Sequence, residues 1–489
     1  MNPLRIGTPE QMATVRQMML SSGYTEAAVC ERYAFENLGR FQALREGRSS
    51  GPDIPDRMEL LVRLFLDSEP VDRTTVRSFL EAGEIEALEA TGLLASNPED
   101  ASQYHGTMLL YEVSGFAIVS DWIKKSLTQV AEDAVFPAIT PQTLQFLSML
   151  PSSPCEALLD IGTGSGIAAL LGSRCANHVW ATDITRRSVE FANFNVALNG
   201  VSHVTVLEGS LYEPVAGKTF DRIVAHPPYA PSLQPTQVYK DGGEDGEQIT
   251  RGIIGNAAAH LRPGGRLYVV CMATDRKGKR VGERIREMIG PAQAEFDVFV
   301  GAREIFQPTE FYFQQALQGR ASIDEVVQRH EVFSRLEIEH LAKCVIVIQR
   351  ITGPRPVFTV RKQMGKDTRS DGVEAAIALE MAVLSPGWLD GLWDARPKAP
   401  ADLRLKLVNR IEDGRWVTAD CAAEVMSPFF LRARCPSWAG AMLARADGSL
   451  TLREHFQFFV DGGIFPAEGA ADGFIEFAGT FVRGGLLEV

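Results

Sequence analysis

The sequence has no segment that would place it in or across a membrane. None of its 489 residues falls in an apolar run of 18 or more, the length that a membrane-spanning helix requires. The first residues, MNPLRIGTPEQ, lack the basic stretch followed by an apolar stretch that forms a secretion signal. We therefore expect a cytoplasmic protein with no membrane partner.

Patterns that bind metals or form disulfides are also missing. The seven cysteines are scattered, their number is odd and no two of them form a Cys-x-x-Cys pair. The eight histidines likewise lack the spacing of metal ligands. This usage is typical of reduced, mostly buried thiols in a cytosol, and it predicts that the chain has no metal site.

Positively charged residues are fewer than negatively charged ones. Lys and Arg number 49 against 62 Asp and Glu, so the formal net charge is −13. Because the neutralisation of phosphates supplies much of the affinity of nucleic-acid-binding proteins, this balance argues against RNA or DNA as the partner, without excluding a local basic patch. The densest basic run, around Arg361 and Lys362, is predicted to be a solvated loop.

A glycine-rich loop is the most informative feature that is present. The stretch ALLDIGTGSG at 157–166 is predicted to be a buried strand that ends at Asp160 and passes through a tight loop into a helix at 167–173. Glycine is needed where a ligand approaches the bare backbone of such a turn, and the helix start offers free N–H groups to a carboxylate or phosphate. The glycines are Gly162, Gly164 and Gly166.

The spacing of these glycines separates two kinds of ligand. The dinucleotide-binding fingerprint has glycines at its first, third and sixth positions, but here the sixth position is Ile167 and the third glycine occupies the fifth. Asp160 stands two residues before the first glycine. By itself the loop also fits a simple strand-to-helix turn or another nucleotide site, so the residues downstream of it must decide between these ligands.

Three further strands come next, in the order of a parallel α/β sheet. His178–Thr182 is predicted to be the second strand, and Asp183 at its end is placed to bind ribose hydroxyls. Val204–Leu207 is predicted to be the third strand, and Ser210 lies just beyond it. Phe220–Ala225 is predicted to be the fourth strand. The polar ends of these strands therefore meet at one edge of the sheet.

Together these features resemble class I S-adenosylmethionine (SAM) methyltransferases. The glycine loop resembles motif I of that family, and His226-Pro227-Pro228-Tyr229 resembles the Asn-Pro-Pro-Tyr motif of the enzymes that methylate planar nitrogens. The segment 239–246, YKDGGEDG, is similar to one found in the HemK/PrmC group of protein-glutamine methyltransferases, and Leu-x-Pro-Gly-Gly at 261–265 is common before strand five. The resemblance covers about 157–273, less than half of the chain.

The resemblance implies SAM as the cofactor. Asp160 would bind the methionine amino group, the glycines would pass under the carboxypropyl arm and Asp183 would bind the ribose. Ser210 stands where the family usually has an acidic residue for the adenine amino group, so only a hydroxyl is available there. The expected cofactor-binding residues are Asp160, Gly162, Thr163, Gly164, Gly166, Asp183, Ile184, Ser210, Leu211 and His226.

The resemblance also implies an acceptor site made by His226, the Pro227 carbonyl and Tyr229. These groups would hold a target NH2 while the aromatic ring packs against its plane. His226 replaces the usual Asn or Asp, and a neutral imidazole has one donor and one acceptor in a different geometry from an amide. It can hold an amide or amine of a protein or small molecule, or act as a general base in an O-methyltransferase of a small metabolite. A third interpretation is a catalytically silent SAM-binding regulatory protein.

The expected fold is α/β, with three domains. Residues 1–130 are predicted to form a helical, winged-helix-like domain that serves as a lid or a partner-binding module. Residues 131–352 are predicted to form a Rossmann-like, seven-stranded methyltransferase core, in which the last strand, Lys343–Arg350, is antiparallel and lies between strands five and six. Residues 353–489 are predicted to form a small α+β winged-helix-like domain for binding or for dimerisation into a homodimer.

Local patterns predict most of the elements outside the core. The N-terminal helices are expected at 8–21, 27–46, 57–67, 73–82 and 84–91, followed by a hairpin of 107–113 and 116–120. Thr140 is expected to start the helix 142–150, and an insertion of two helices at 309–317 and 323–333 precedes the last core strand. The C-terminal elements are expected at 403–411, 415–419, 427–433, 438–445, 452–461 and 474–483, with a terminal strand after them.

Overall fold

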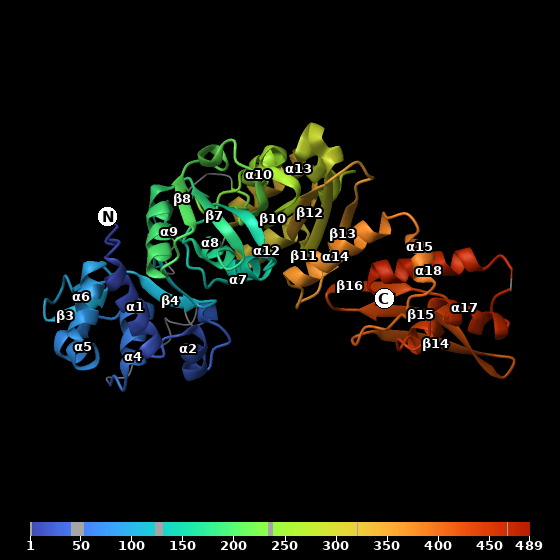
Figure 1. Cartoon of the computed structure of the whole chain (residues 1–489), viewed down its shortest axis with the longest axis horizontal. Coiled ribbons are helices and arrows are strands. Elements are labelled where there is room, and N and C mark those ends of the chain that lie inside the picture. Colours follow the sequence, from blue (N-terminus) through green and yellow to red (C-terminus); the bar gives the residue numbers. More distant parts are fainter. Residues whose placement is uncertain (1, 41–52, 123–130, 233–237, 320, 467) are drawn as a thin grey trace.

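The computed structural model describes residues 2–40, 53–122, 131–232, 238–319, 321–466 and 468–489. Three parts follow one another along the molecule: N-terminal helices with small sheets, a large central sheet covered by helices, and a C-terminal α+β part (Figure 1). Among the described residues, no helix combines the length and apolar character needed to cross a membrane.

The central sheet has the order β8-β7-β6-β9-β10-β12-β11. β6, β7, β8, β9 and β10 are parallel, whereas β12 is antiparallel to both of its neighbours, β10 and β11. This confirms the Rossmann-like fold and the predicted place of the last core strand. The strands are Cys155–Ile161 (β6), Ala176–Asp183 (β7), Val204–Glu208 (β8), Phe220–Ala225 (β9), Leu261–Arg276 (β10), Phe296–Phe306 (β11) and Ile338–Arg350 (β12).

Helices cover both faces of this sheet because its strands are apolar on both sides. One core packs α7, α8, α9 and α14 against one face, and a second packs α10 and α11 against the other. The helices are Pro141–Ser148 (α7), Ile167–Gly172 (α8), Arg186–Leu198 (α9), Gln248–His260 (α10), Val281–Ile289 (α11) and Ser370–Val383 (α14), with short 3-10 turns at Glu213–Val215 and Gly290–Glu295. Thr140 caps α7 as predicted, since its hydroxyl accepts from the Thr143 N–H.

The N-terminal part packs on α9 of the central part. Asn195 and Asn199 of α9 bond through their side chains to the backbone of β5, and Arg16 of α1 donates to the Leu198 carbonyl at 2.9 Å. The elements are α1 Pro9–Ser21, α2 Glu26–Tyr33, α4 Arg57–Leu61 continuing as η2 Val62–Leu66, β1 Val71–Asp72, α5 Arg73–Phe79, α6 Ala82–Ala90, β2 Leu94–Ser96, β3 Gln103–Gly106, β4 Leu109–Val113 and β5 Phe116–Ser120.

One N-terminal expectation changes, one is confirmed, and a small sheet is added. The helix expected at 27–46 ends after Tyr33, because Ala34 adopts a left-handed conformation with φ of 55°; positions 41–46 lie outside the described residues. The hairpin with its turn at Ser114 and Gly115 is confirmed as β4 and β5. It stands apart from a three-stranded sheet of order β1-β3-β2 that the sequence did not predict.

The central sheet continues into the C-terminal part. β13 pairs parallel with β11, β16 pairs antiparallel with β13, and β15 and β14 complete an 11-stranded sheet. The expected terminal strand is wrong: after α18, Glu488 forms only an isolated bridge with Lys398. The remaining elements are α12 Pro308–Leu317, α13 Ile323–Arg335, β13 Thr359–Met364, α15 Trp388–Leu392, β14 Arg404–Glu412, β15 Arg415–Val425, β16 Phe429–Arg434, α16 Ser437–Arg445, α17 Leu452–Asp461 and α18 Ala471–Gly484.

Candidate functional site

The glycine loop lies at the carboxyl edge of the sheet, between β6 and α8. Gly162, Gly164 and Gly166 all have positive φ, at 72°, 54° and 83°. A Cβ added at Gly162 or Gly164 would meet no described atom within 4 Å, whereas one at Gly166 would lie 3.1 Å from the Ala192 Cβ of α9. The first two glycines therefore leave an open backbone cradle, and the third allows α8 and α9 to pack closely.

Asp160 is buried beneath this loop. Its carboxylate accepts from the Thr163 hydroxyl at 2.6 Å, so Thr163 closes the loop from inside. Burial raises the pKa of Asp160 to about 7, and the nearby charge of Asp183 adds to the rise. A buried carboxylate held near half ionisation gains strongly from an incoming cation. The ammonium group that the resemblance places here would be such a cation.

Asp183 does more than the sequence predicted. It ends β7, as expected, but one of its oxygens accepts from the Gly164 N–H at 2.9 Å and the other accepts from the Thr185 N–H at 3.0 Å. The carboxylate thus braces the glycine loop directly. Ile184 follows it at the rim with 60 % of its surface exposed.

The end of β8 is tied to the end of β7. The Gly209 N–H donates to the Asp183 carbonyl at 2.9 Å, and the Thr182 hydroxyl donates to the Leu211 carbonyl at 2.9 Å. Leu211 has a left-handed conformation, with φ of 49°. Ser210 and Leu211 are therefore brought beside Asp183 at the same edge, as the sequence predicted.

His226 begins the loop after β9 and is enclosed by aromatic rings. The edge of Phe146 from α7 meets it at 5.2 Å between centroids, and Tyr229 lies nearly parallel to it at 5.6 Å. Pro227 between them is buried. The Nδ1 atom of His226 is buried without a hydrogen-bond partner among the described residues. Burial lowers the pKa of His226 to about 4, so the imidazole is neutral at physiological pH and offers hydrogen bonds rather than charge.

A cavity of about 120 Å³ opens beside His226 and Tyr229. The charged residues in its lining are Lys343 and Glu304, which pair with each other at 3.0 Å between Nζ and Oε2. Burial raises the pKa of Tyr229 to about 12, so its phenol is also neutral. The lining residues are Pro141, Gln142, Gln145, His226, Tyr229, Val270, Cys271, Glu304, Lys343 and Cys344. The cavity is therefore neutral overall, with two glutamine amides in its wall.

The acidic loop before α10 is anchored by a buried ion cluster that the sequence did not predict. Glu247 is 0 % exposed; its Oε1 accepts from the Thr274 N–H at 2.6 Å and from Nη1 of Arg284 at 2.6 Å. Asp245 pairs with Arg251 at 2.8 Å and with Arg276 at 2.6 Å. The only signal in the sequence was the acidic run itself; its cationic partners come from β10, α10 and α11.

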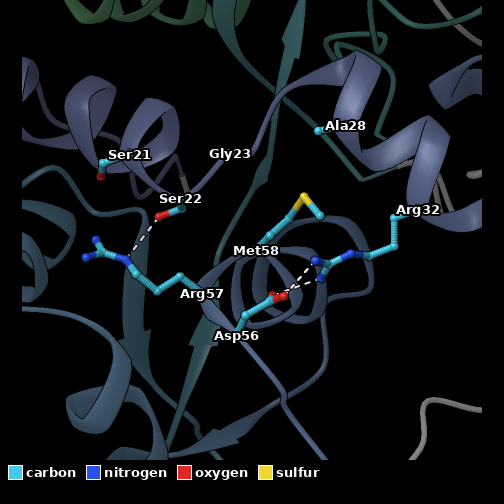
Figure 2. A pocket seen from close by; sticks show the side chains of 8 residues that line it. All are labelled: Ser21, Ser22, Gly23, Ala28, Arg32, Asp56, Arg57 and Met58. Atoms are coloured by element: carbon cyan, nitrogen blue, oxygen red, sulfur yellow. Dashed lines mark hydrogen bonds and ion pairs between the residues drawn. The ribbon is translucent and has the colours of Figure 1, made fainter.

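A second hollow, of about 400 Å³, lies in the N-terminal part. Figure 2 shows its two arginines turned toward partners already present: Arg32 meets Asp56 with two hydrogen bonds of 2.8 and 2.6 Å, and Arg57 donates from Nε to the Ser22 hydroxyl at 3.1 Å. Arg57 also pairs with Glu84. Both cations in the lining of this hollow are therefore already compensated.

Residues 135–294 match the family model described as the methyltransferase small domain. The release factor glutamine methyltransferase of Gloeobacter violaceus is 35 % identical over 130 residues, which cover 24 % of this chain and 46 % of that protein. The enzyme of the same name from Xylella fastidiosa is 34 % identical over 154 residues, covering 29 % and 56 %. The chain thus spans about half the length of these relatives.

A solved structure of a ribosomal protein L11 methylase from Lactobacillus delbrueckii subsp. bulgaricus aligns with 48 % of this chain and 93 % of its own, at a TM-score of 0.27 and 20 % identity. The family match covers the stretch that carries the glycine loop, Asp183 and the His-Pro-Pro-Tyr segment. Residues 135–294 are therefore a class I, SAM-dependent methyltransferase domain of the small-domain family, close to the HemK/PrmC group.

Proposed function

We propose that the chain transfers the methyl group of SAM to a neutral nitrogen, the side-chain amide of a protein acceptor. The observation that carries this proposal is the cavity beside His226 and Tyr229, whose two charged lining residues neutralise each other and which lies at the same sheet edge as the glycine loop. The relatives support it, since they are named as enzymes that act on a glutamine of release factors. The one cation in the cavity's described lining, Lys343, is already paired, which disfavours phosphate-bearing acceptors.

The carboxyl edge offers a consistent set of groups for SAM. In our proposal Asp160 binds the amino group, the open backbone at Gly162 and Gly164 accommodates the amino-acid arm, and Asp183 binds the ribose while it braces Gly164. Exposed Ile184 covers the adenine ring, and Ser210 and Leu211 border it. SAM supplies a sulfonium methyl group that is already activated for displacement.

The acceptor residues act by position. In our proposal His226 and the Pro227 carbonyl hold the amide NH2, and Tyr229 packs against its plane. Proline lacks an N–H, so the carbonyls of the Pro-Pro segment face few competing donors. An amide nitrogen is a poor nucleophile. The main catalytic contribution of the protein is therefore to hold this nitrogen in line with the methyl group. Such positioning can be worth about 7–11 kcal/mol.

An O-methyltransferase that uses His226 as its base is the runner-up. A pKa of about 4 makes the imidazole a weak base, because the burial that encloses it opposes the charged product. His226→Asn separates the two mechanisms. If His226 only holds an amide, we expect the variant to keep its kcat within about tenfold of wild type; loss of a base would cost on the order of 10²–10⁴. Steady-state assays from pH 5 to 9 give the comparison.

Affinity for SAM is expected to fall in acid because of Asp160. Its pKa of about 7 means that below neutrality the carboxyl is mostly protonated and must lose its proton to pair with the ammonium group. The dissociation constant should therefore rise up to about tenfold per pH unit below 7 and level off above it. Calorimetry from pH 5.5 to 8.5 checks this, and Asp160→Asn should bind weakly at every pH without the trend.

The acceptor class has its own test. Full-length protein is incubated with methyl-labelled SAM and a lysate of its host, and the label is followed into protein, nucleic acid and small molecules. We expect label in protein, on glutamine after digestion. Label in RNA, DNA or a metabolite would overturn the proposed acceptor. SAM binding without any transfer would favour the silent regulatory protein instead.

We also propose roles for the two outer parts. The order α4, β1, α5, α6, β2, β3 supports a winged-helix-like N-terminal module, and the ion pair between Asp121, which follows β5, and Arg187 in the first turn of α9 suits a part that presents the acceptor. The C-terminal part is proposed as a binding or dimerisation module. We further propose that the protein is a cytoplasmic homodimer and that its methyl acceptor is not a nucleic acid.

A further inference from the structure

Cysteines that are far apart in the sequence meet as pairs in the fold. Cys271 of β10 and Cys344 of β12 face each other in register, and Cys421 and Cys435 have their Sγ atoms 3.4 Å apart. A third pair lies at the amino edge of the sheet, opposite the glycine loop. That pair is Cys155, which begins β6, and Cys175, which precedes β7.

The third pair is held together by the backbone and is partly exposed. The Cys155 N–H donates to the Cys175 carbonyl at 2.9 Å, so the two residues are neighbours at the starts of adjacent parallel strands. Neither residue is fully buried. The pair therefore combines proximity with incomplete burial, and disulfide formation in a folded protein requires both proximity and access.

A buried arginine distinguishes this pair from the other two. Arg222 of β9 is 6 % exposed and its Nη1 lies 3.4 Å from the Cys175 Sγ. Its other bonds are to the Pro151 and Ser153 carbonyls, each at 3.0 Å, and to the Ser153 hydroxyl at 2.7 Å. Among the described residues no carboxylate pairs with this guanidinium, since the adjacent Asp221 pairs with Arg262.

Buried charges are costly unless they are paired, and Cys175 is the ionisable group that Arg222 contacts. The hydrogen bond from Cys155 and the charge of Arg222 lower the pKa of the Cys175 thiol to about 6. The other pairs are different: burial and its neighbouring thiol raise the pKa of Cys435 to about 12, and the pKa of Cys271 is also raised. Of these thiols, Cys175 thus has its pKa lowered, whereas the pKa values of Cys271 and Cys435 are raised.

We propose that Cys175 is a site of reversible oxidation by hydroperoxides and that Cys155 is its resolving partner. The Cys175 thiolate attacks one peroxide oxygen, the O–O bond breaks, and the leaving alkoxide or hydroxide takes up a proton. The sulfenic acid on Cys175 then condenses with the Cys155 thiol to form a disulfide and water. Two thiols are oxidised and one peroxide is reduced to an alcohol or water, and a dithiol reductant reverses the reaction.

The test uses the full-length reduced protein treated with hydrogen peroxide at pH 7, quenched by alkylation and mapped by mass spectrometry. We expect a disulfide between Cys155 and Cys175 that forms at least tenfold faster than any oxidation of Cys421 and Cys435, which are the built-in control pair. In Cys155→Ser, a dimedone adduct should accumulate on Cys175. In Cys175→Ser, the disulfide should be lost.

A second measurement begins with the unaltered protein. The rate of alkylation of Cys175 by iodoacetamide in the unaltered protein should rise with a midpoint below pH 7, and Arg222→Lys should move that midpoint upward. If Cys175 reacts no faster than Cys435 with both reagents, or if its midpoint lies above pH 8, the proposal is wrong. These results are independent of methyl transfer, so they do not depend on the proposed function.

Discussion

Glu247→Gln is expected to lower the free energy of unfolding by about 3–5 kcal/mol. Glu247 is 0 % exposed, and its Oε1 accepts a hydrogen bond from Nη1 of Arg284 at 2.6 Å. The Nη2 atoms of Arg251 and Arg276 each lie 3.7 Å from its Oε2. Removing the negative charge leaves the Arg284 guanidinium, whose side chain is 8 % exposed, without a paired acid among the described residues, while Asp245 still pairs with Arg251 and Arg276. The loop that follows the His-Pro-Pro-Tyr segment is anchored by this cluster, so we expect activity to fall with stability.

The matched control for this change is Glu287→Gln. Glu287 also pairs with a cation, Lys279, but both side chains are more than half exposed, at 56 % and 55 %. Exposed pairs of this kind are worth about 0–1 kcal/mol, so the control should unfold almost as wild type does. Urea unfolding of the three proteins, measured side by side, gives the comparison. Equal midpoints for the two variants would contradict the assigned role of the buried cluster.

Asp183→Ala is expected to weaken SAM binding at least tenfold, or about 1.4 kcal/mol. The substitution removes two contributions at once. It takes away the brace on the Gly164 N–H, seen here at 2.9 Å, and the carboxylate that we propose for the ribose hydroxyls. Because Gly164 holds a positive φ of 54°, the unbraced loop gains conformational freedom that binding must remove. Calorimetry with SAM measures the loss.

Two further variants interpret that result. Asp183→Asn keeps an oxygen that can accept from Gly164, so an affinity between those of wild type and Asp183→Ala is expected. Glu156→Ala changes an exposed carboxylate at the opposite edge, where it accepts from Asn177 at 2.7 Å, and should leave the affinity unchanged. An Asp183→Ala protein that binds SAM as wild type does would remove Asp183 from the site.

Local sequence determined the core elements well. The fourth strand at Phe220–Ala225 has the predicted bounds, because its apolar residues mark it without tertiary contacts. β13 was missed because Thr359–Met364 is mostly half-exposed and polar, and it becomes a strand only by pairing with β11, whose partner residues lie about 60 positions earlier. Non-local pairing leaves no local pattern to find.

The candidate site shows the same difference between features set by local sequence and features set by non-local contacts. The sequence placed Asp160, Asp183 and His226 correctly at the sheet edge, since strand ends and glycine spacing are local features. What these groups experience depends on the surrounding fold. The low pKa of His226 follows from its burial against Phe146 and Tyr229. The contact of Arg222 with Cys175 joins β9 to the start of β7 across the intervening β6, between residues 47 positions apart. Neither can be derived from motif spacing.

Titration calorimetry of the full-length protein with SAM at pH 8 tests most directly whether the carboxyl edge of the sheet is a SAM site. We predict saturable binding of one SAM per chain, with the demethylated product S-adenosylhomocysteine competing for the same site. A protein that is folded and binds neither compound at millimolar concentration would contradict the assignment of this site.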